Sequence, residues 1–209
     1  STVMPEDLNL NGKVVAVTGA ARGMGRAMVR GFLAEGAKVV AMDLSWDPTG
    51  FSGDNDDAFL RELQDRQDDV LVATADISDT QQVESAYLGT MEKFGTVDVL
   101  VNNAGGAPPA DSATVSPRFN EKILALNLTA PMTASQAVYP VMSAQDGGGV
   151  ILNISSVSGS RPNPQGVAYG AAKAGLENMT RTLAHEWGPA IRVVAVTVGM
   201  IMTEEAGTF

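Results

Sequence analysis

One stretch near the start of this chain sets its architecture, Lys13-Val-Val-Ala-Val-Thr-Gly-Ala-Ala-Arg-Gly-Met-Gly25. Residues 13–18 form an apolar, β-branched run, which predicts a strand buried on both faces. Gly19, Gly23 and Gly25 then allow a tight turn, a close approach of the backbone to a phosphate, and close packing of the next helix on the strand. The N–H groups and the positive dipole end of that helix favour a pyrophosphate. The stretch therefore predicts a dinucleotide-binding turn.

Similar β-branched runs alternate with helical stretches along the rest of the chain. We expect strands at residues 13–18, 37–42, 70–74, 97–101, 150–155 and 191–196, and helices at about 24–35, 57–66, 79–94, 118–143 and 167–187. Strand alternating with helix implies a parallel sheet with right-handed crossovers and helices on both faces. The predicted fold class is α/β, a Rossmann-type doubly wound parallel sheet in three αβα layers, with residues 1–209 forming a single domain.

Composition and charge argue against several classes of function. The 209 residues carry a formal net charge of −10 and a pI of about 4.5, which argues against a nucleic-acid or membrane-surface partner. The chain has no cysteine, and its single histidine, His185, cannot build a multi-histidine metal site, so we expect no metal. No apolar run could span a bilayer and no signal-peptide pattern is present, so we expect a soluble, cytoplasmic protein.

Tyr169 and Lys173 are the candidate catalytic pair. They stand four residues apart in a predicted helix, so they share one face and the ammonium can act on the phenol. A phenol is a poor base at neutral pH, and an adjacent cation favours its ionised form. The pair suggests a general acid/base that handles the proton of an alcohol or a carbonyl. The spacing alone is weak support, because two common residues recur at it by chance.

Asp43 bears on the choice between NAD and NADP. It ends the second predicted strand, eighteen residues beyond Gly25, where a carboxylate can bind the adenosine ribose hydroxyls and would repel a 2′-phosphate. Arg22, inside the glycine-rich turn, could instead attract that phosphate. We give Asp43 more weight, because a carboxylate there meets the phosphate directly, and the sequence therefore favours NAD.

Several further motifs follow in order along the chain. They are Asp76-Ile77 after the third predicted strand, Asn102-Asn-Ala-Gly105 after the fourth, Asn127 in the long helix, and Ser156 thirteen residues before Tyr169. Together with the glycine-rich turn and Tyr169-x-x-x-Lys173, they resemble the short-chain dehydrogenase/reductase family over essentially the whole chain. The resemblance implies an oxidoreductase that transfers a hydride between NAD(H) and a secondary alcohol or ketone, with Tyr169 as general acid/base.

The resemblance also implies a role for each matching residue. Catalysis would fall to Ser156, Tyr169, Lys173 and Asn127, which bind the substrate oxygen, exchange its proton, favour the phenolate, and hold a relay water, respectively. Cofactor contacts would come from Gly19, Arg22, Gly23, Met24, Gly25, Asp43, Leu44, Asp76, Ile77, Asn103, Ala104, Gly105, Tyr169, Lys173, Gly199, Ile201 and Thr203. Asp76 would bind the adenine edge, and Asn103 would hold the adenosine half and the central strand. Asn127 could also be a helix-interior asparagine bonded to backbone, and both roles can hold at once.

The chain departs from the family pattern in two places. Its last predicted strand continues as Val194-Ala-Val-Thr-Val-Gly199-Met-Ile-Met-Thr203, with valines at 194 and 198 where the family has asparagine and proline. Without the proline, φ at that turn is not fixed, so we expect a less rigid nicotinamide end. The chain also stops at Phe209, without the lid, further helix and last strand of a complete member, which together take about 40 residues. We interpret this as an omitted segment rather than as a working enzyme of this length.

Two other functions stay open beside the NAD-linked oxidoreductase. One is an NADPH-dependent 3-oxoacyl thioester reductase, which Asp43 opposes, and the other is a catalytically idle nucleotide-binding module. The resemblance further implies a homo-oligomer, a dimer or a tetramer, built on helices 118–143 and 167–187. The expected partner is a small-molecule alcohol or ketone, chosen by residues 106–110, residues 158–166 and the missing lid.

Overall fold

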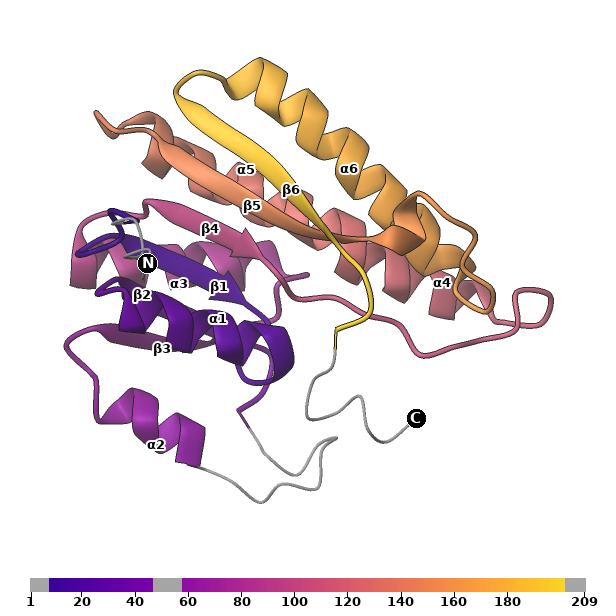
Figure 1. Ribbon diagram of the computed structural model, residues 1–209, viewed down its shortest axis with the longest axis horizontal. Coiled ribbons are helices and arrows are strands. Elements are labelled where there is room, and N and C mark those ends of the chain that lie inside the picture. Colours follow the sequence, from indigo (N-terminus) through magenta and orange to yellow (C-terminus); the bar gives the residue numbers. More distant parts are fainter. Residues whose placement is uncertain (1–7, 47–57, 202–209) are drawn as a thin grey trace, which may run out of the picture.

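A parallel six-stranded sheet in the order β3-β2-β1-β4-β5-β6 forms the centre of the protein (Figure 1). The structure is a computed structural model, and it describes residues 8–46 and 58–201. The strands are β1 (Val14–Thr18), β2 (Lys38–Asp43), β3 (Val70–Thr74), β4 (Val99–Asn102), β5 (Gly149–Ser156) and β6 (Ile191–Val198). All six predicted strands are present within a few residues of their expected ends, and every pair is parallel.

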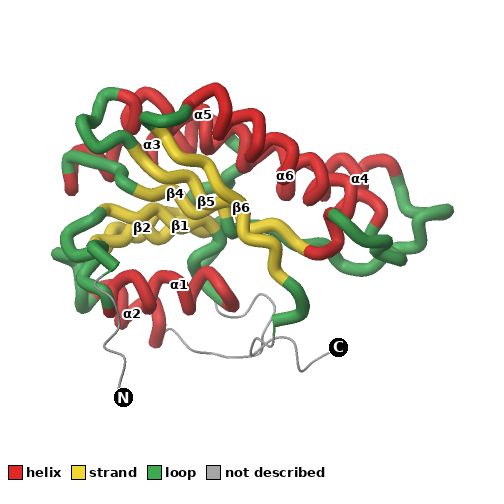
Figure 2. Tube along the Cα trace, turned by 45° about the horizontal axis from the view of Figure 1, so that its top comes forward, coloured by secondary structure: helices red, strands yellow, loops and turns green. Residues whose placement is uncertain are grey.

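Helices cover both faces of this sheet. They are α1 (Gly23–Ala34), α2 (Ala58–Gln64), α3 (Thr80–Phe94), α4 (Pro117–Leu124), α5 (Ala130–Ser143) and α6 (Val167–Trp187). Figure 2 shows α1 and α2 on one side of the sheet and α3, α5 and α6 on the other. The predicted three-layer α/β fold is confirmed. None of the described helices is both long and apolar enough to cross a membrane.

The direction of winding reverses between β1 and β4. The chain builds β1, β2 and β3 outward to one edge of the sheet, then returns and builds β4, β5 and β6 toward the other edge. In open parallel sheets, ligands bind outside the carboxyl ends of the strands at such a reversal. The fold therefore directs attention to the residues that follow β1, β4 and β5.

Two apolar cores lie on opposite faces of the sheet, because side chains alternate between the faces of a strand. Val14 and Ala16 of β1 belong to the core under α3 and α5, while Val15 and Val17 belong to the core under α1 and α2. All four are buried. The strand is apolar on both faces for this reason, as the sequence predicts.

The long helix expected at 118–143 is instead interrupted. Between α4 and α5 lies a π-helical segment, η2 (Ala125–Thr129), in which the Ala130 N–H bonds to the Ala125 carbonyl oxygen. Pro131 explains the interruption: it lacks an N–H, and its ring cannot fit against the carbonyl one turn earlier. The prediction of one uninterrupted helix was wrong at this point.

Strand β6 has a partner on one side only. It pairs with β5 along Gly149–Ser156, and no other strand in the described part of the chain lies beyond it. On its α1-facing side, the side chains of Val194 and Val196 are 44% and 46% exposed. Within the described residues, β6 with Val194 and Val196 is therefore the least covered strand of the sheet.

Candidate active site

The glycine-rich turn after β1 is packed so tightly that side chains would not fit. Gly19 has φ of 66°, and a Cβ there would lie 2.8 Å from the Cα of Ala104. A Cβ at Gly25 would collide with the carbonyl oxygen of Gly19. Gly23 also has a positive φ, of 52°. The turn thus needs glycine at these positions, both for its own geometry and for its contact with the segment after β4.

The first turn of α1 leaves N–H groups for a bound anion. The N-cap residue is Arg22, whose side chain does not cap the helix, and no acidic side chain lies in the first turn. The side chain of Met24 packs into the core below α1, which leaves its backbone at the turn. Uncapped N–H groups and the helix dipole suit a pyrophosphate. The residues present therefore fit a dinucleotide at this end of the sheet.

Thr18 and Asn103 tie the glycine-rich turn to the end of β4. The Thr18 hydroxyl accepts from the Asn103 and Ala104 N–H groups, both at 3.0 Å. The Asn103 side-chain amide donates to the carbonyl oxygens of Thr18, at 3.0 Å, and Gly19, at 3.2 Å. Asn103 therefore holds the two central strands in place at the point of reversal.

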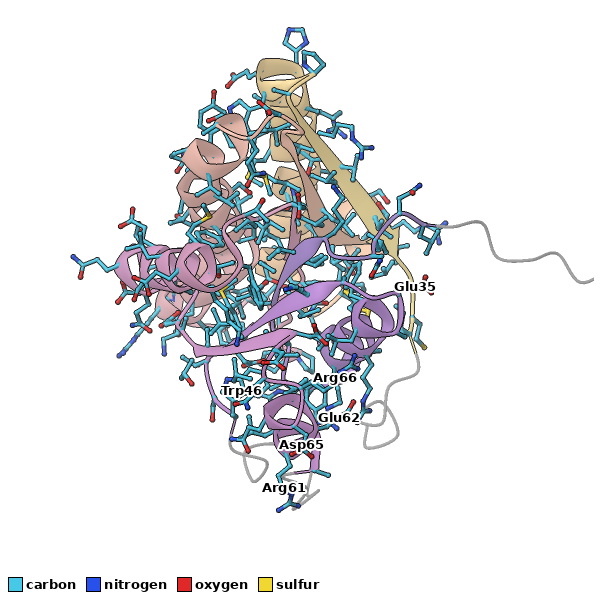
Figure 3. All side chains as sticks on the ribbon, turned by 90° about the vertical axis from the view of Figure 1, so that its left-hand side faces the viewer. Glu35, Trp46, Arg61, Glu62, Asp65 and Arg66 are labelled. Atoms are coloured by element: carbon cyan, nitrogen blue, oxygen red, sulfur yellow. The ribbon has the colours of Figure 1, made fainter. Side chains whose placement is uncertain are left out.

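Asp43 lies against the same turn. It is 7% exposed, and its Oδ2 accepts from the Ala21 N–H at 2.9 Å. The next residue, Leu44, is 66% exposed. Trp46, labelled in Figure 3, then donates its indole N–H to the Ala73 carbonyl oxygen of β3 at 3.3 Å. The carboxylate of Asp43 is thereby held beside the glycine-rich turn, and the chain beyond it is fixed to the end of β3.

Asp76 and Ile77 follow the carboxyl end of β3, the strand next to β2. Asp76 is half-buried, and its Oδ1 accepts from the Ser78 N–H at 2.8 Å. Ile77 is buried in the core under α3, so only its backbone can meet a ligand. The structure thus brings the predicted adenosine contacts, Asp43, Leu44, Asp76 and Ile77, to the carboxyl ends of β2 and β3.

Asn127 sits in η2 and is completely buried. Its Oδ1 accepts from the Gly106 N–H at 2.8 Å, and its Nδ2 donates to the Gly106 and Ile123 carbonyl oxygens, both at 2.9 Å. A Cβ at Gly105 would lie 2.6 Å from Asn127 Oδ1 and 3.4 Å from Lys173 Nζ. Asn127 bonds backbone, as one of the two interpretations expects, and it also lies close to Lys173.

Lys173 is a buried cation beside Tyr169. It is 4% exposed, its Nζ donates to the Ile154 carbonyl oxygen at 2.7 Å, and the ammonium is 5.6 Å from the centre of the Tyr169 ring. Burial lowers the pKa of Lys173 from 10.5 to about 8. The two residues meet on one face of α6, as their spacing predicts. A proton-transferring phenol next to a buried cation can act as an acid/base pair.

Ser156 ends β5, one residue after the buried Ser155, and is itself 8% exposed. Its Oγ accepts from the Ser158 N–H at 3.2 Å, as the cap of the short 3₁₀ helix η3 (Val157–Gly159). A hydroxyl that accepts one bond still has its own hydrogen to donate. Ser156 is therefore placed to donate to an oxygen at the carboxyl end of β5.

The segment after β6 is described only in part. Gly199 and Ile201 follow the strand, and Ile201 is 43% exposed. Thr203 lies outside the described residues. The predicted contacts of this segment with a nicotinamide stay predictions.

A family model for short chain dehydrogenases matches residues 13–208. This chain belongs to the short-chain dehydrogenase family. The family assignment that the motifs predict is therefore confirmed, and with it the general function of an oxidoreductase that binds a nicotinamide dinucleotide.

Two relatives and one solved structure show the range of short-chain dehydrogenases that resemble this one. It is 36% identical over 198 residues to the 7alpha-hydroxysteroid dehydrogenase of Bacteroides fragilis, covering 93% of this chain and 73% of that protein. It is 36% identical over 197 residues to a 3-oxoacyl-(acyl-carrier-protein) reductase of Thermotoga maritima, covering 94% and 77%. A 3-ketoacyl-(acyl-carrier-protein) reductase of Brucella melitensis, solved with NADH, superposes with a TM-score of 0.82 at 33% identity, covering 96% and 81%.

Sequence reasoning missed a set of polar contacts beneath this short-chain dehydrogenase site. Asn102 Nδ2 donates to Asn153 Oδ1 at 2.9 Å, and Asn153 Nδ2 donates to the Thr180 hydroxyl at 2.9 Å. Glu177 accepts from the Ser155 hydroxyl at 2.8 Å. The signal for Asn153 was its place inside an otherwise apolar strand. Glu177 gave no such signal, since an acidic residue in a helix is usually a solvated one.

Proposed function

We propose that this short-chain dehydrogenase transfers a hydride between NAD(H) and a secondary alcohol or ketone. The observation that carries the proposal is the buried ammonium of Lys173, 5.6 Å from the Tyr169 ring, at the edge of the sheet where Ser156 ends β5. A bound nicotinamide would supply the hydride chemistry. The glycine-rich turn, the first turn of α1 and Lys173 are the groups that would hold the dinucleotide.

Each catalytic side chain has one task in this proposal. The Tyr169 hydroxyl exchanges the proton of the substrate oxygen, and the Lys173 ammonium favours the ionised phenol. Ser156 donates a hydrogen bond to the same oxygen and stabilises the charge that develops on it. Asn127 holds the backbone of Gly106 through two hydrogen bonds. Because Asn127 also lies close to Lys173, it helps to fix the groups that surround the Lys173 ammonium.

NAD is the proposed cofactor, with NADP disfavoured. The support is the carboxylate of Asp43, which its bond from the Ala21 N–H holds next to the glycine-rich turn. A 2′-phosphate brought to this position would meet a negative charge, whereas the two ribose hydroxyls of NAD can donate to it. Arg22 lies on the same turn and is the group that would oppose this preference.

Tyr169 lines a small cavity of about 10 Å³, which is room for about one water molecule, so a substrate with an apolar body is supported by the side chains around the cavity and not by its size. Its lining is mostly apolar: Ala107, Pro108, Ala110, Val115, Phe119, Ile123, Val167 and Ala168, with Asn120, Gln165 and Gly166. The likeness to a hydroxysteroid dehydrogenase points the same way. A second candidate, a 3-oxoacyl thioester reductase, is favoured by the likeness to the Thermotoga maritima protein, and Asp43 opposes the NADPH that such a reductase was expected to use.

We further propose a homo-oligomer, a dimer or tetramer, that works in the cytoplasm. The support is a set of large apolar side chains that are exposed on α4 and α5: Leu124, Met132 and Tyr139. Isolated apolar residues are common on protein surfaces, but a run of them along neighbouring helices suits a partner copy.

The experiment is a screen for NAD reduction by the purified protein with alcohols, hydroxysteroids, sugars and hydroxyacids. Tyr169→Phe is the matched control, because it removes the exchangeable proton and keeps the ring. We expect turnover with at least one class in the native protein and a loss of about 100-fold or more in the variant. Absence of turnover in both proteins, with NADH still bound, would favour the idle nucleotide-binding module.

A further inference from the structure

We propose that Glu177 is a positioning residue that holds the carboxyl end of β6 in place beside the catalytic residues. The inference rests on the proposed function, since it concerns how the segment after β6 is kept in place for the dinucleotide. Glu177 lies on α6, one helical turn after Lys173 and two after Tyr169. Residues at these spacings share one face of a helix, so Tyr169, Lys173 and Glu177 lie in one row along α6.

One carboxylate oxygen of Glu177 bridges two strands. Its Oε1 accepts from the Ser155 hydroxyl at 2.8 Å and from the Thr197 hydroxyl at 3.2 Å. Ser155 of β5 and Thr197 of β6 are paired directly across the parallel ladder, so their side chains stand next to each other on the α6 face. Helix α6, strand β5 and strand β6 therefore meet at a single acceptor atom.

Among the described residues, the other polar side-chain contacts between α6 and the sheet reach β5 and go no further. Lys173 Nζ donates to the Ile154 carbonyl oxygen, and the Thr180 hydroxyl accepts from Asn153 Nδ2. Glu177 lies between these two along the helix and extends the polar contact one strand further. The bond from Ser155, at 2.8 Å, is the shorter and more buried of the two bonds to Glu177, and the bond from Thr197, at 3.2 Å, is the exposed one that reaches β6.

Strand β6 needs such a tie near its end. Among the described residues β6 pairs with β5 alone, Val194 and Val196 on its other face are exposed, and residue 198 is a valine, which does not fix φ as a proline would. Gly199 and Ile201 follow directly. A shift of the strand end would move the proposed nicotinamide contacts, and through Ser155 it would also disturb the neighbouring Ser156.

Three substitutions test the proposal. Thr197→Val removes one hydroxyl from an exposed strand position that valine suits, and Glu177→Leu removes the acceptor. Glu177→Gln keeps an oxygen that can accept both bonds. Glu186→Leu, an exposed position on the same helix, is the matched control. We measure KM for NAD, kcat, the Kd of NADH, and amide hydrogen exchange across residues 196–201 without cofactor.

We expect Thr197→Val and Glu177→Leu to raise KM for NAD and the Kd of NADH by about tenfold and to speed exchange at 196–201. Glu177→Gln should stay within about threefold of the native protein in every measurement, a residual that the weaker neutral acceptor explains. Glu186→Leu should change none of them.

The inference is overturned if Thr197→Val leaves exchange at 196–201 and the Kd of NADH at native values, or if Glu177→Gln is as impaired as Glu177→Leu. The exchange measurement is independent of turnover, so the two proposals fail separately. A native protein that binds no NADH and reduces no NAD removes the proposed function, while faster exchange in Thr197→Val would still support the tie.

Discussion

At the scale of single residues, replacing Lys173 should lower catalytic activity without lowering the stability of the fold. Lys173→Met removes the ammonium beside Tyr169, so we expect the catalytic efficiency toward the alcohol to fall by about 100-fold or more. The fold should not suffer, because a buried charge is costly and an unbranched apolar chain fills the same space. Steady-state kinetics at pH 7 check the expected loss of catalytic efficiency, and thermal unfolding at pH 7 checks the expected unchanged stability. A melting temperature well below the native value would contradict the second.

The lowered pKa of Lys173 also makes stability depend on pH. Burial brings it from 10.5 to about 8, so between these values the unfolded chain binds a proton that the folded protein has released. The free energy of unfolding should therefore rise as the pH rises through this window, by up to about 3 kcal/mol, and this group should contribute no slope below it. Denaturant unfolding of the native protein and Lys173→Met, compared across the window, isolates the contribution.

Asp43 carries the prediction on cofactor choice. Asp43→Asn removes the negative charge and keeps an oxygen for the Ala21 N–H, so the turn should stay intact. We expect the ratio of catalytic efficiency with NADP to that with NAD to increase by about tenfold. Kinetics with both dinucleotides measure this ratio. An unchanged ratio would mean that Arg22, rather than Asp43, governs the discrimination.

At the scale of elements, η2 determines where Asn127 points. Asn127→Ala would leave the Gly106 N–H and the Gly106 and Ile123 carbonyl oxygens without this partner. We expect the free energy of unfolding to fall by about 2 kcal/mol and the Gly106 amide to exchange faster. Chemical denaturation and hydrogen exchange test the two effects. Native-like exchange at Gly106 would show that Asn127 does not hold this loop.

The elements show what the sequence could and could not predict. The helix with Tyr169 and Lys173 was predicted with its observed ends, because an apolar face at helical spacing and a following glycine mark it. The break at η2 was not predicted. Pro131 is a sequence signal for it, but Pro140 lies inside α5 without ending that helix, so a proline alone does not locate a break. The bridge from Glu177 to Ser155 and Thr197 depends on the register of β5 and β6, which no local pattern encodes.

On the scale of the whole molecule, the order of the strands was the most predictable feature. Alternation of strand and helix allows few connections, and right-handed crossovers leave a doubly wound sheet as the natural solution. The carboxyl ends of β1, β2, β4 and β5 then lie at the same end of the sheet, and the motifs that follow these strands are brought together there. The substrate could not be predicted in the same way, because its contacts come from loops whose residues carry no distinctive chemistry.

The proposed oligomer is tested by a charge on its expected interface. Met132, on α5, is 37% exposed, and Met132→Glu should cost little in a monomer but oppose burial against a second copy. We expect light scattering after size-exclusion chromatography to give a smaller mass for the variant than for the native protein. Equal masses for the two would place any interface elsewhere.

The outer side of β6, which has no partner strand among the described residues, affects how a chain of residues 1–209 can be handled. Within residues 8–46 and 58–201, the outer side of β6 presents backbone N–H and carbonyl groups with which a strand of another molecule could pair, and Val194 and Val196 beside them are exposed. Such pairing needs no unfolding and grows with concentration, so melting temperature alone is a poor guide to storage conditions. Turbidity in concentrated, folded samples is the failure to watch for during purification and crystallisation. Val196→Lys is the first substitution to try against it.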